Sequence, residues 1–238
     1  MNIEPIAHFH SPFTSKFGIP RQAGIVGELR GQIVFEPKFR HAEALRGLEA
    51  YDYVWLIWGF SGNKGAGEQE RRNGNKGSFH ATVRPPLLGG NERRGVWATR
   101  SPFRPNGLGL SSVRLERIEW ETPDGPVVHV LGADLMDGTP IYDLKPYLEY
   151  VDSHTDVRSG FVDERAWQKL DVEMPAELVA LFTLDELRAL TAVLSQDPRP
   201  QYHDDPQRVY GMPFAGREVR FRVEGNRLIV VLVEPVAP

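Results

Sequence analysis

Short runs of apolar and β-branched residues, separated by turns rich in glycine and proline, dominate the first 150 residues. The run 51–60 is the most apolar, and its length and aromatic content are typical of a buried central strand. No alternation of strands and helices appears, so a doubly wound sheet is not expected. We expect a barrel or sandwich with strands at 3–9, 24–35 (in two pieces broken near Gly31), 51–60, 81–83, 96–99, 111–120 and 127–136, and one or two helical turns at 41–49.

The pattern changes after Tyr150. A polar stretch at 151–163 precedes helical spacing at 176–182 and 184–194, where Thr183 and Glu186 have the spacing of a capping box. Two apolar runs at 219–223 and 228–233 flank a Glu-Gly-Asn turn and predict a hairpin. We therefore expect a mainly β domain over 1–150 and a smaller α+β domain over 151–238.

Composition narrows the classes of chemistry. With 41% hydrophobic and 25% charged residues, the chain can form an ordinary globular core. It has no cysteine, which excludes disulfides, thiolate metal sites and a cysteine nucleophile. No signal peptide or run of membrane-spanning length appears, so we expect a soluble, cytoplasmic protein.

The net charge of −4 is unevenly distributed. Nine basic and three acidic residues between Ser61 and Arg104 give this stretch a charge of +6, so the remainder carries −10. Such a stretch favours contact with a polyanion, although a solvated loop has the same composition.

Four segments place glycine, proline and charge where a plain barrel does not need them. The segments 11–24 and 84–91 are each compatible with a ligand-binding loop or with an irregular connection. In 95–111, Arg100 and Arg104 lie in a loop stiffened by proline, which suits binding of a carboxylate or phosphate. In 134–147, carboxylates, a lysine and two phenols gather, which suits proton transfer or an ion-pair network; no histidine accompanies them, so we expect no metal.

These segments together resemble the TsaA-like family, also called TrmO, of tRNA N6-threonylcarbamoyladenosine methyltransferases. The resemblance rests on SPF…KFGIPRQAG, RGLEAYDYVWLIWGF, TVRPPLLGGN, GVWATRSPFRPNGLGLS and DLMDGTPIYDLKPYLEY, with QDPRPQY in the C-terminal region. The sequence departs from the family at Ser61, where histidine is frequent, at Gly107, which replaces a proline, and in a longer basic loop.

The resemblance implies a small antiparallel β-barrel that binds S-adenosylmethionine, a homodimer with the cofactor near the subunit interface, and threonine tRNA as substrate. The product is the N6-methylated form of threonylcarbamoyladenosine beside the anticodon, at position 37. By motif position, the cofactor-binding residues are Gln22, Ala23, Gly24, Ser61, Gly62, Arg100, Leu110, Asp134, Leu135, Met136 and Asp137.

The acceptor nitrogen, bonded to a purine and a carbonyl group, is a poor nucleophile. Asp143, Lys145 and Tyr147 are candidates for orienting or deprotonating it. Arg104 or Arg100 is suited to the threonyl carboxylate, Arg84 to phosphate, and Arg199 and Tyr202 to the anticodon stem-loop. The alternatives are an RNA-binding barrel without catalysis, or a methyltransferase for another RNA or a small substrate.

Overall fold

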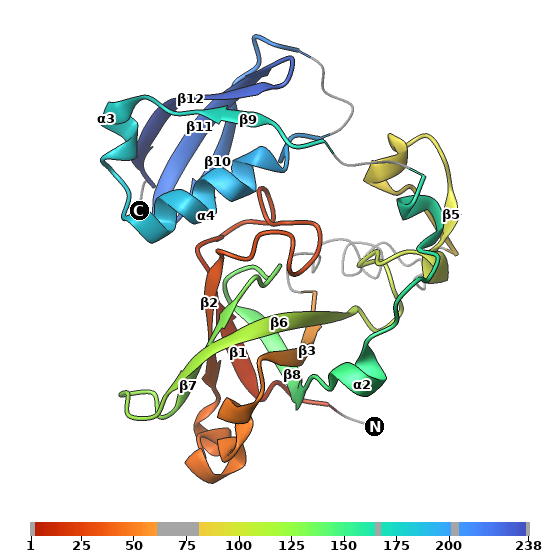
Figure 1. The fold of residues 1–238 in the computed structure, drawn as a ribbon, viewed down its shortest axis with the longest axis vertical. Helices are drawn as coiled ribbons and strands as arrows, with labels where there is room; N and C mark the ends of the chain where they lie inside the picture. Colours follow the sequence, from red (N-terminus) through yellow and green to blue (C-terminus); the bar gives the residue numbers. More distant parts are fainter. Residues whose placement is uncertain (1–2, 61–80, 165–167, 201–204, 237–238) are drawn as a thin grey trace, which may run out of the picture.

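The computed structural model describes residues 3–60, 81–164, 168–200 and 205–236. Within these ranges, six strands close into an antiparallel barrel in the order β1-β2-β7-β6-β3-β8, which confirms the expected fold class (Figure 1). The barrel strands are β1 (Ala7–His10), β2 (Arg30–Phe35), β3 (Tyr53–Gly59), β6 (Leu108–Glu119), β7 (Val127–Leu131) and β8 (Thr139–Pro146).

Strand β3 is the central strand that its sequence predicts. It pairs with β6 on one side and with β8 on the other. Its alternate residues Val54, Leu56 and Trp58 are buried in the barrel core, which also contains Phe9 and Ile141. The two-residue period of a strand thus directs one face of an almost wholly apolar run into the core.

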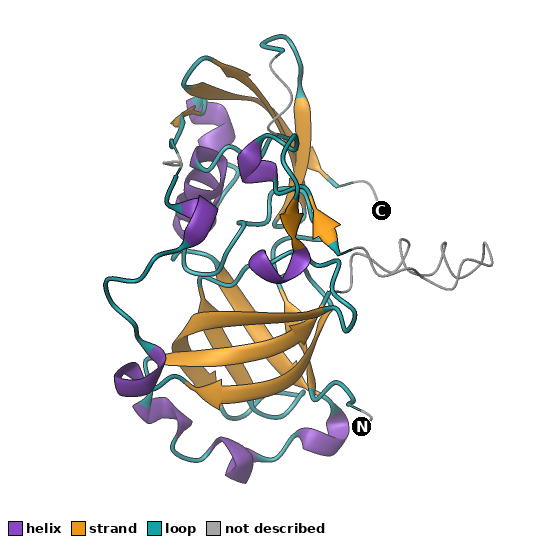
Figure 2. Cartoon of the chain, turned by 90° about the vertical axis from the view of Figure 1, so that its right-hand side faces the viewer, coloured by secondary structure: helices purple, strands orange, loops and turns teal. Residues whose placement is uncertain are grey.

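The C-terminal part forms a mixed sheet in the order β10-β11-β12-β9, covered by helix α4 (Figures 1 and 2). The predicted hairpin is present as β11 and β12, and the predicted capping box is present at Thr183, whose hydroxyl accepts from the backbone N–H of Glu186. The elements are β9 (Asp171–Glu173), α3 (Ala176–Val179), α4 (Leu184–Ser195), β10 (Tyr210–Phe214), β11 (Arg217–Glu224) and β12 (Arg227–Pro235).

Several local predictions were wrong. No strand was predicted between 137 and 150, but the eight-residue strand β8 lies there, and its two prolines and two charged residues obscure the strand pattern. The first piece predicted in 24–35 forms turns, and β7 ends at Leu131. The predicted strand at 96–99 is a 3-10 turn instead, and the short β4–β5 pairing ends just before it, at Arg94 and Gly95.

Short helical turns and one short strand pair complete the described chain. These elements are η1 (Pro37–Phe39), η2 (Ala42–Leu45), η3 (Leu48–Ala50), β4 (Thr82–Val83), η4 (Pro86–Leu88), β5 (Arg94–Gly95), η5 (Val96–Ala98), α2 (Glu149–Asp152) and η6 (Gly160–Val162). Two of the turns, η2 and η3, lie in or next to the segment 41–49, where one or two helical turns were predicted. In the part of the chain that the structure describes, no helix has the length and apolar character needed to cross a membrane.

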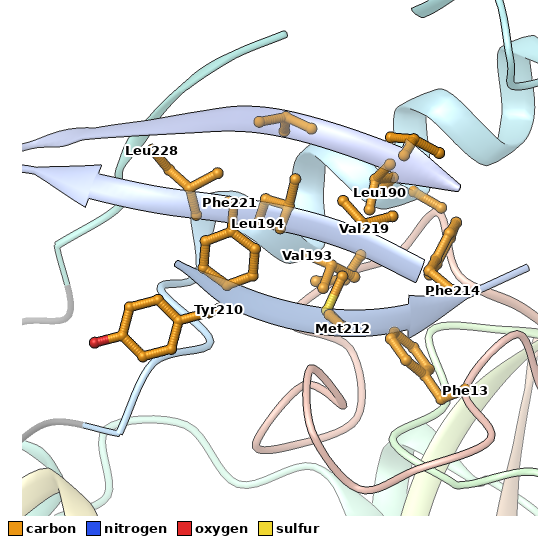
Figure 3. Close-up of a cluster of buried hydrophobic side chains, with 14 of the residues drawn as sticks. Phe13, Leu190, Val193, Leu194, Tyr210, Met212, Phe214, Val219, Phe221 and Leu228 are labelled. Atoms are coloured by element: carbon orange, nitrogen blue, oxygen red, sulfur yellow. The ribbon is translucent and has the colours of Figure 1, made fainter. Parts of the chain in front are cut away.

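The core of the C-terminal sheet includes side chains from the other end of the sequence. Phe13, Val26 and Leu29, all in the connection between β1 and β2, are buried with the C-terminal residues (Figure 3). We refer to residues 11–29 as the β1–β2 connection. It lies between the barrel and the C-terminal sheet, so the hydrophobic core crosses the expected boundary near residue 150 (Figure 1).

Candidate active site

Hydrogen bonds join the β1–β2 connection to the β7–β8 connection at one end of the barrel. The backbone N–H of Gly24 donates to the Gly132 carbonyl over 2.8 Å, and the N–H of Asp137 donates to the Phe13 carbonyl over 2.8 Å. The Asp137 carboxylate accepts from the backbone N–H of Ser11 over 3.0 Å. Gly132 has φ of +79°, and an added Cβ would lie 3.5 Å from the Gly24 Cα, so the two backbones approach closely.

Arg100 adds the loop before β6 to this assembly. Its guanidinium donates to the side-chain oxygen of Gln22 and lies close enough to Asp134 to favour the ionised carboxylate. Asp134 also accepts from the backbone N–H of Ala23. We call the residues of these three connections that meet here, namely Gln22, Ala23, Gly24, Arg100 and 132–137, the loop cluster.

Asp134 is a partly buried carboxylate of the loop cluster, and its surroundings shift its pKa. Burial raises its pKa, and hydrogen bonds, chiefly from Ser111, oppose that rise. The Ser111 hydroxyl donates to Asp134 over 2.6 Å and accepts from the Trp58 indole N–H over 3.0 Å. A side-chain network therefore connects the barrel interior to the loop cluster.

Ser111 and Trp58 were not singled out from the sequence. The signal was present, because Ser111 occupies an inward position of β6 between Gly109 and Val113, where a purely structural strand would place an apolar residue. A buried hydroxyl needs a hydrogen-bond partner, and here the partner is a carboxylate predicted to bind the cofactor.

The remaining predicted cofactor residues are placed differently. Leu135 is 1% exposed, and its side chain belongs to the barrel core, whereas Met136 is partly buried. Leu110 is 56% exposed on the outer face of β6. Ser61 and Gly62 lie outside the described residues, as does Tyr202.

Leu110 shares the outer face of the barrel with a predicted catalytic residue. Ile57 of β3 is the partner of Leu110 on β6 and of Asp143 on β8, so the three residues form one row across the strands. Two strand spacings correspond to about 10 Å between the backbones at Leu110 and Asp143. Asp134 instead meets the inward side chain of Ser111.

The three predicted catalytic residues lie along β8 and just after it. The Lys145 ammonium group is 3.0 Å from the Asp143 carboxylate, and both side chains are accessible to solvent. The Tyr147 ring packs against the rings of Tyr53 and Trp55, with centroids 6.1 and 5.7 Å away. Asp143 and Lys145 are therefore coupled by charge, whereas Tyr147 belongs to an aromatic group.

The predicted substrate-binding arginines differ in how much of their hydrogen-bonding capacity is used. Arg104 donates to the Thr99 carbonyl over 2.7 Å and stacks over Trp97, 5.3 Å from the ring centroid. Arg84 is exposed. Arg199 donates two hydrogen bonds to Asp197, of 2.8 and 2.9 Å, and is 14% exposed. This pair is a local contact between two residues of the described stretch 168–200.

Comparison with known proteins places this geometry in a family. The model of the tRNA-methyltransferase O N-terminal domain matches residues 8–153, and that of the TrmO C-terminal domain matches residues 168–236. The chain belongs to the TrmO family. A TrmO crystal structure from Pseudomonas aeruginosa superposes with a TM-score of 0.74 at 30% identity and covers 98% of each chain.

Two relatives agree with this assignment. The Escherichia coli tRNA (adenine(37)-N6)-methyltransferase is 34% identical over 240 residues, covering 98% of this chain and 97% of its own. A putative S-adenosylmethionine-dependent methyltransferase, RcsF, from Pseudomonas aeruginosa is 35% identical over 238 residues, covering 97% and 96%. This TrmO chain is accordingly an S-adenosylmethionine-dependent tRNA methyltransferase.

The loop cluster fits the chemistry of that cofactor. The amino-acid end of S-adenosylmethionine carries an ammonium and a carboxylate group, and Asp134 and Arg100 supply the opposite charges within one hydrogen-bonded assembly. Among the described residues, no group of three or more His, Cys, Asp or Glu side chains is arranged to hold a metal ion.

Proposed function

We propose that this chain methylates N6 of threonylcarbamoyladenosine at position 37 of threonine tRNA. The observation that carries the proposal is the loop cluster, in which Gln22, Arg100 and Asp134 come together from three separate connections. The names of the relatives support adenine 37 as the target. The threonylcarbamoyl group and the choice of threonine tRNA follow from the motif resemblance described above.

In this proposal the loop cluster binds and orients the methyl donor. Asp134 and Arg100 pair with the charged groups of its amino-acid end, and the Gln22 amide beside Arg100 contributes a hydrogen bond. When bound, S-adenosylmethionine supplies a methyl group already activated by the positive sulfonium. Because the donor is activated, the protein contributes mainly alignment, which can account for several kcal/mol of a reaction barrier.

In this proposal, residues on β8 orient and deprotonate the acceptor nitrogen. Asp143 is the candidate for accepting the N6 proton, and Lys145, 3.0 Å away, pairs with its carboxylate and orients it. The row that links Asp143 to Leu110 through Ile57 supports this role, because Leu110 is a predicted cofactor residue and lies on the same barrel face. Tyr147 acts by holding the adjoining aromatic group.

Arginines account for the anionic parts of the substrate. Arg104 is assigned to the threonyl carboxylate, since its guanidinium is partly buried and already held by Thr99 and Trp97. Arg84 is assigned to phosphate, and Arg199 to the anticodon stem-loop, where its pairing with Asp197 fixes its direction. If phosphate contacts dominate, tRNA affinity falls steeply with salt, and a flat salt response removes this assignment.

A homodimer is part of the proposal. Large apolar side chains remain exposed on the outer face of β3 and β6 and on α2: Tyr53 is 44%, Leu110 56% and Tyr150 84% exposed. Such a surface favours association with a second copy. Sedimentation velocity at micromolar concentration is expected to give the dimer mass, and a monomer would contradict this part of the proposal.

The deciding experiment is methyl transfer in vitro. Purified protein is incubated with S-adenosylmethionine and threonine tRNA that carries threonylcarbamoyladenosine, and the digested nucleosides are analysed by mass spectrometry. One added methyl on that nucleoside is expected, with none on tRNA that has unmodified adenosine 37. Methylation of another nucleoside would refute the proposed substrate, and cofactor binding without transfer would favour a binding protein.

A further inference from the structure

The β1–β2 connection contacts the C-terminal domain on one side and contributes to the loop cluster on the other. On one side, Phe13, Val26 and Leu29 are 1%, 1% and 3% exposed within the C-terminal core. The Phe13 ring meets Phe214 of β10 edge to face, with centroids 5.5 Å apart and planes at 68° (Figure 3). Side chains so fully buried fix the position of the segment that carries them.

Close backbone packing supports the same attachment. Gly18, with φ of +91°, lies so near Met212 that an added Cβ would be 2.1 Å from the sulfur. The backbone N–H of Ala215 donates to the Pro12 carbonyl over 3.0 Å. The Asp197 carboxylate also attracts Arg21, the residue immediately before Gln22. Apolar, backbone and charged contacts thus all join this connection to the C-terminal domain.

On its other side, the same connection supplies Gln22, Ala23 and Gly24 to the loop cluster. We propose that the C-terminal domain is a positioning element for cofactor binding, because it holds the β1–β2 connection in the conformation that the loop cluster requires. This inference rests on the proposed role of Gln22, Ala23 and Gly24 in binding S-adenosylmethionine.

The physical basis is preorganisation. Three glycines, at positions 18, 24 and 27, make the connection flexible as an isolated segment. If it were free, cofactor binding would have to order it, and affinity would fall by the fraction of molecules with the competent conformation. Burial of Phe13, Val26 and Leu29 supplies that order before the cofactor arrives.

The test alters the C-terminal side of the contact and leaves the loop cluster unchanged. Met212→Ala removes the side chain packed on Gly18, and Phe214→Leu is a milder change at the ring facing Phe13. Leu228→Ala is the matched control: Leu228 is also fully buried in this core, but it lies at the end away from Phe13 (Figure 3). Gln22→Ala tests the loop cluster itself.

Four measurements are made on each variant: thermal unfolding, S-adenosylmethionine affinity by calorimetry, hydrogen exchange of residues 11–29, and steady-state kinetics at varied cofactor concentration. Met212→Ala and Phe214→Leu are expected to increase exchange in 11–29 and to weaken affinity, by about tenfold for Met212→Ala, or about 1.4 kcal/mol. The KM for the cofactor should rise while kcat at saturating cofactor is retained. Leu228→Ala should lower the unfolding temperature comparably, with affinity within about twofold of the wild type.

The outcomes separate the inference from the proposed function. Unchanged affinity in both Met212→Ala and Phe214→Leu, with Gln22→Ala weakened, would overturn the positioning role and leave the binding site intact. Unchanged affinity in Gln22→Ala would instead refute the proposed site. Equal weakening in Leu228→Ala would also overturn the inference, because general loss of stability would then explain the effect.

Discussion

Replacement of Ser111 by alanine is expected to affect both stability and cofactor binding. The change leaves the Trp58 indole N–H without its acceptor and Asp134 without its 2.6 Å hydrogen bond. An unsatisfied buried donor and a lost bond to a carboxylate each cost about 1–3 kcal/mol, so the combined loss is roughly 2–6 kcal/mol. At about 2–4 °C per kcal/mol for a chain of this size, the unfolding temperature falls by roughly 4–24 °C.

The loss of stability caused by Ser111→Ala should depend on pH in a defined direction. Burial raises the folded-state pKa of Asp134, and loss of the Ser111 hydrogen bond raises it further. Ionisation of a carboxyl group with a raised folded-state pKa destabilises the fold at pH values above the unfolded-state pKa. The difference between Ser111→Ala and the wild type should therefore narrow as the pH falls towards about 4, the ordinary Asp value.

The matched control is Ser112→Ala on the opposite face of the same strand. Thermal unfolding and calorimetric titration with S-adenosylmethionine are measured for both variants at neutral and acidic pH. Ser111→Ala should be the less stable and the weaker binder. Equal stability of the two variants would refute the reasoning, since it would mean that the Trp58–Ser111–Asp134 network contributes nothing.

Four further outcomes are expected. Arg104→Ala should raise the KM for tRNA much more than the Kd for the cofactor, and equal losses in a titration of both ligands would contradict its assignment. Asp143→Asn should lower kcat at saturating cofactor about 100-fold or more, as loss of general base catalysis does, and wild-type turnover would end that role. Burial raises the pKa of Asp134, so on acidification the cofactor affinity should begin to fall at a higher pH than it would with an exposed aspartate. Asp134→Asn should abolish this part of the pH dependence in calorimetry. Thr183→Ala should cost about 1 kcal/mol of unfolding free energy, because it removes the hydroxyl half of the capping box. The Thr183 backbone N–H and hydroxyl both lower the pKa of Glu186, and only the hydroxyl is lost in the variant, so the wild-type advantage in denaturant melts should shrink as the pH falls through the Glu186 pKa. An unchanged melt would contradict this.

The parts of the fold that were predictable carry their signal locally. The apolar run of β3, the capping box of α4 and the β11–β12 turn are each specified by neighbouring residues. Strand β8 was missed because its stabilisation comes from pairing with β1 and β3, which its own sequence does not reveal.

The candidate site, too, contains residues that the sequence predicted and residues whose role depends on distant contacts. The motif resemblance anticipated Gln22, Arg100 and Asp134, and the structure brings them together. It did not anticipate Ser111, whose role depends on contacts across the barrel interior. The resemblance also did not anticipate that Phe13 packs against Phe214, because two residues 201 positions apart in the sequence are brought together only by the whole fold.

The packing of Trp58 has a consequence for redesign of the enzyme. Gly109 lies so close to the indole that an added Cβ would be 2.3 Å from the ring, and Trp58 is 7% exposed. The indole therefore fills the space over Gly109, so a side chain at position 109 could be accommodated only if the ring moved and gave up its hydrogen bond to Ser111. A change of donor specificity is better sought in the loop cluster, where side chains can be replaced without changing the register of the barrel strands.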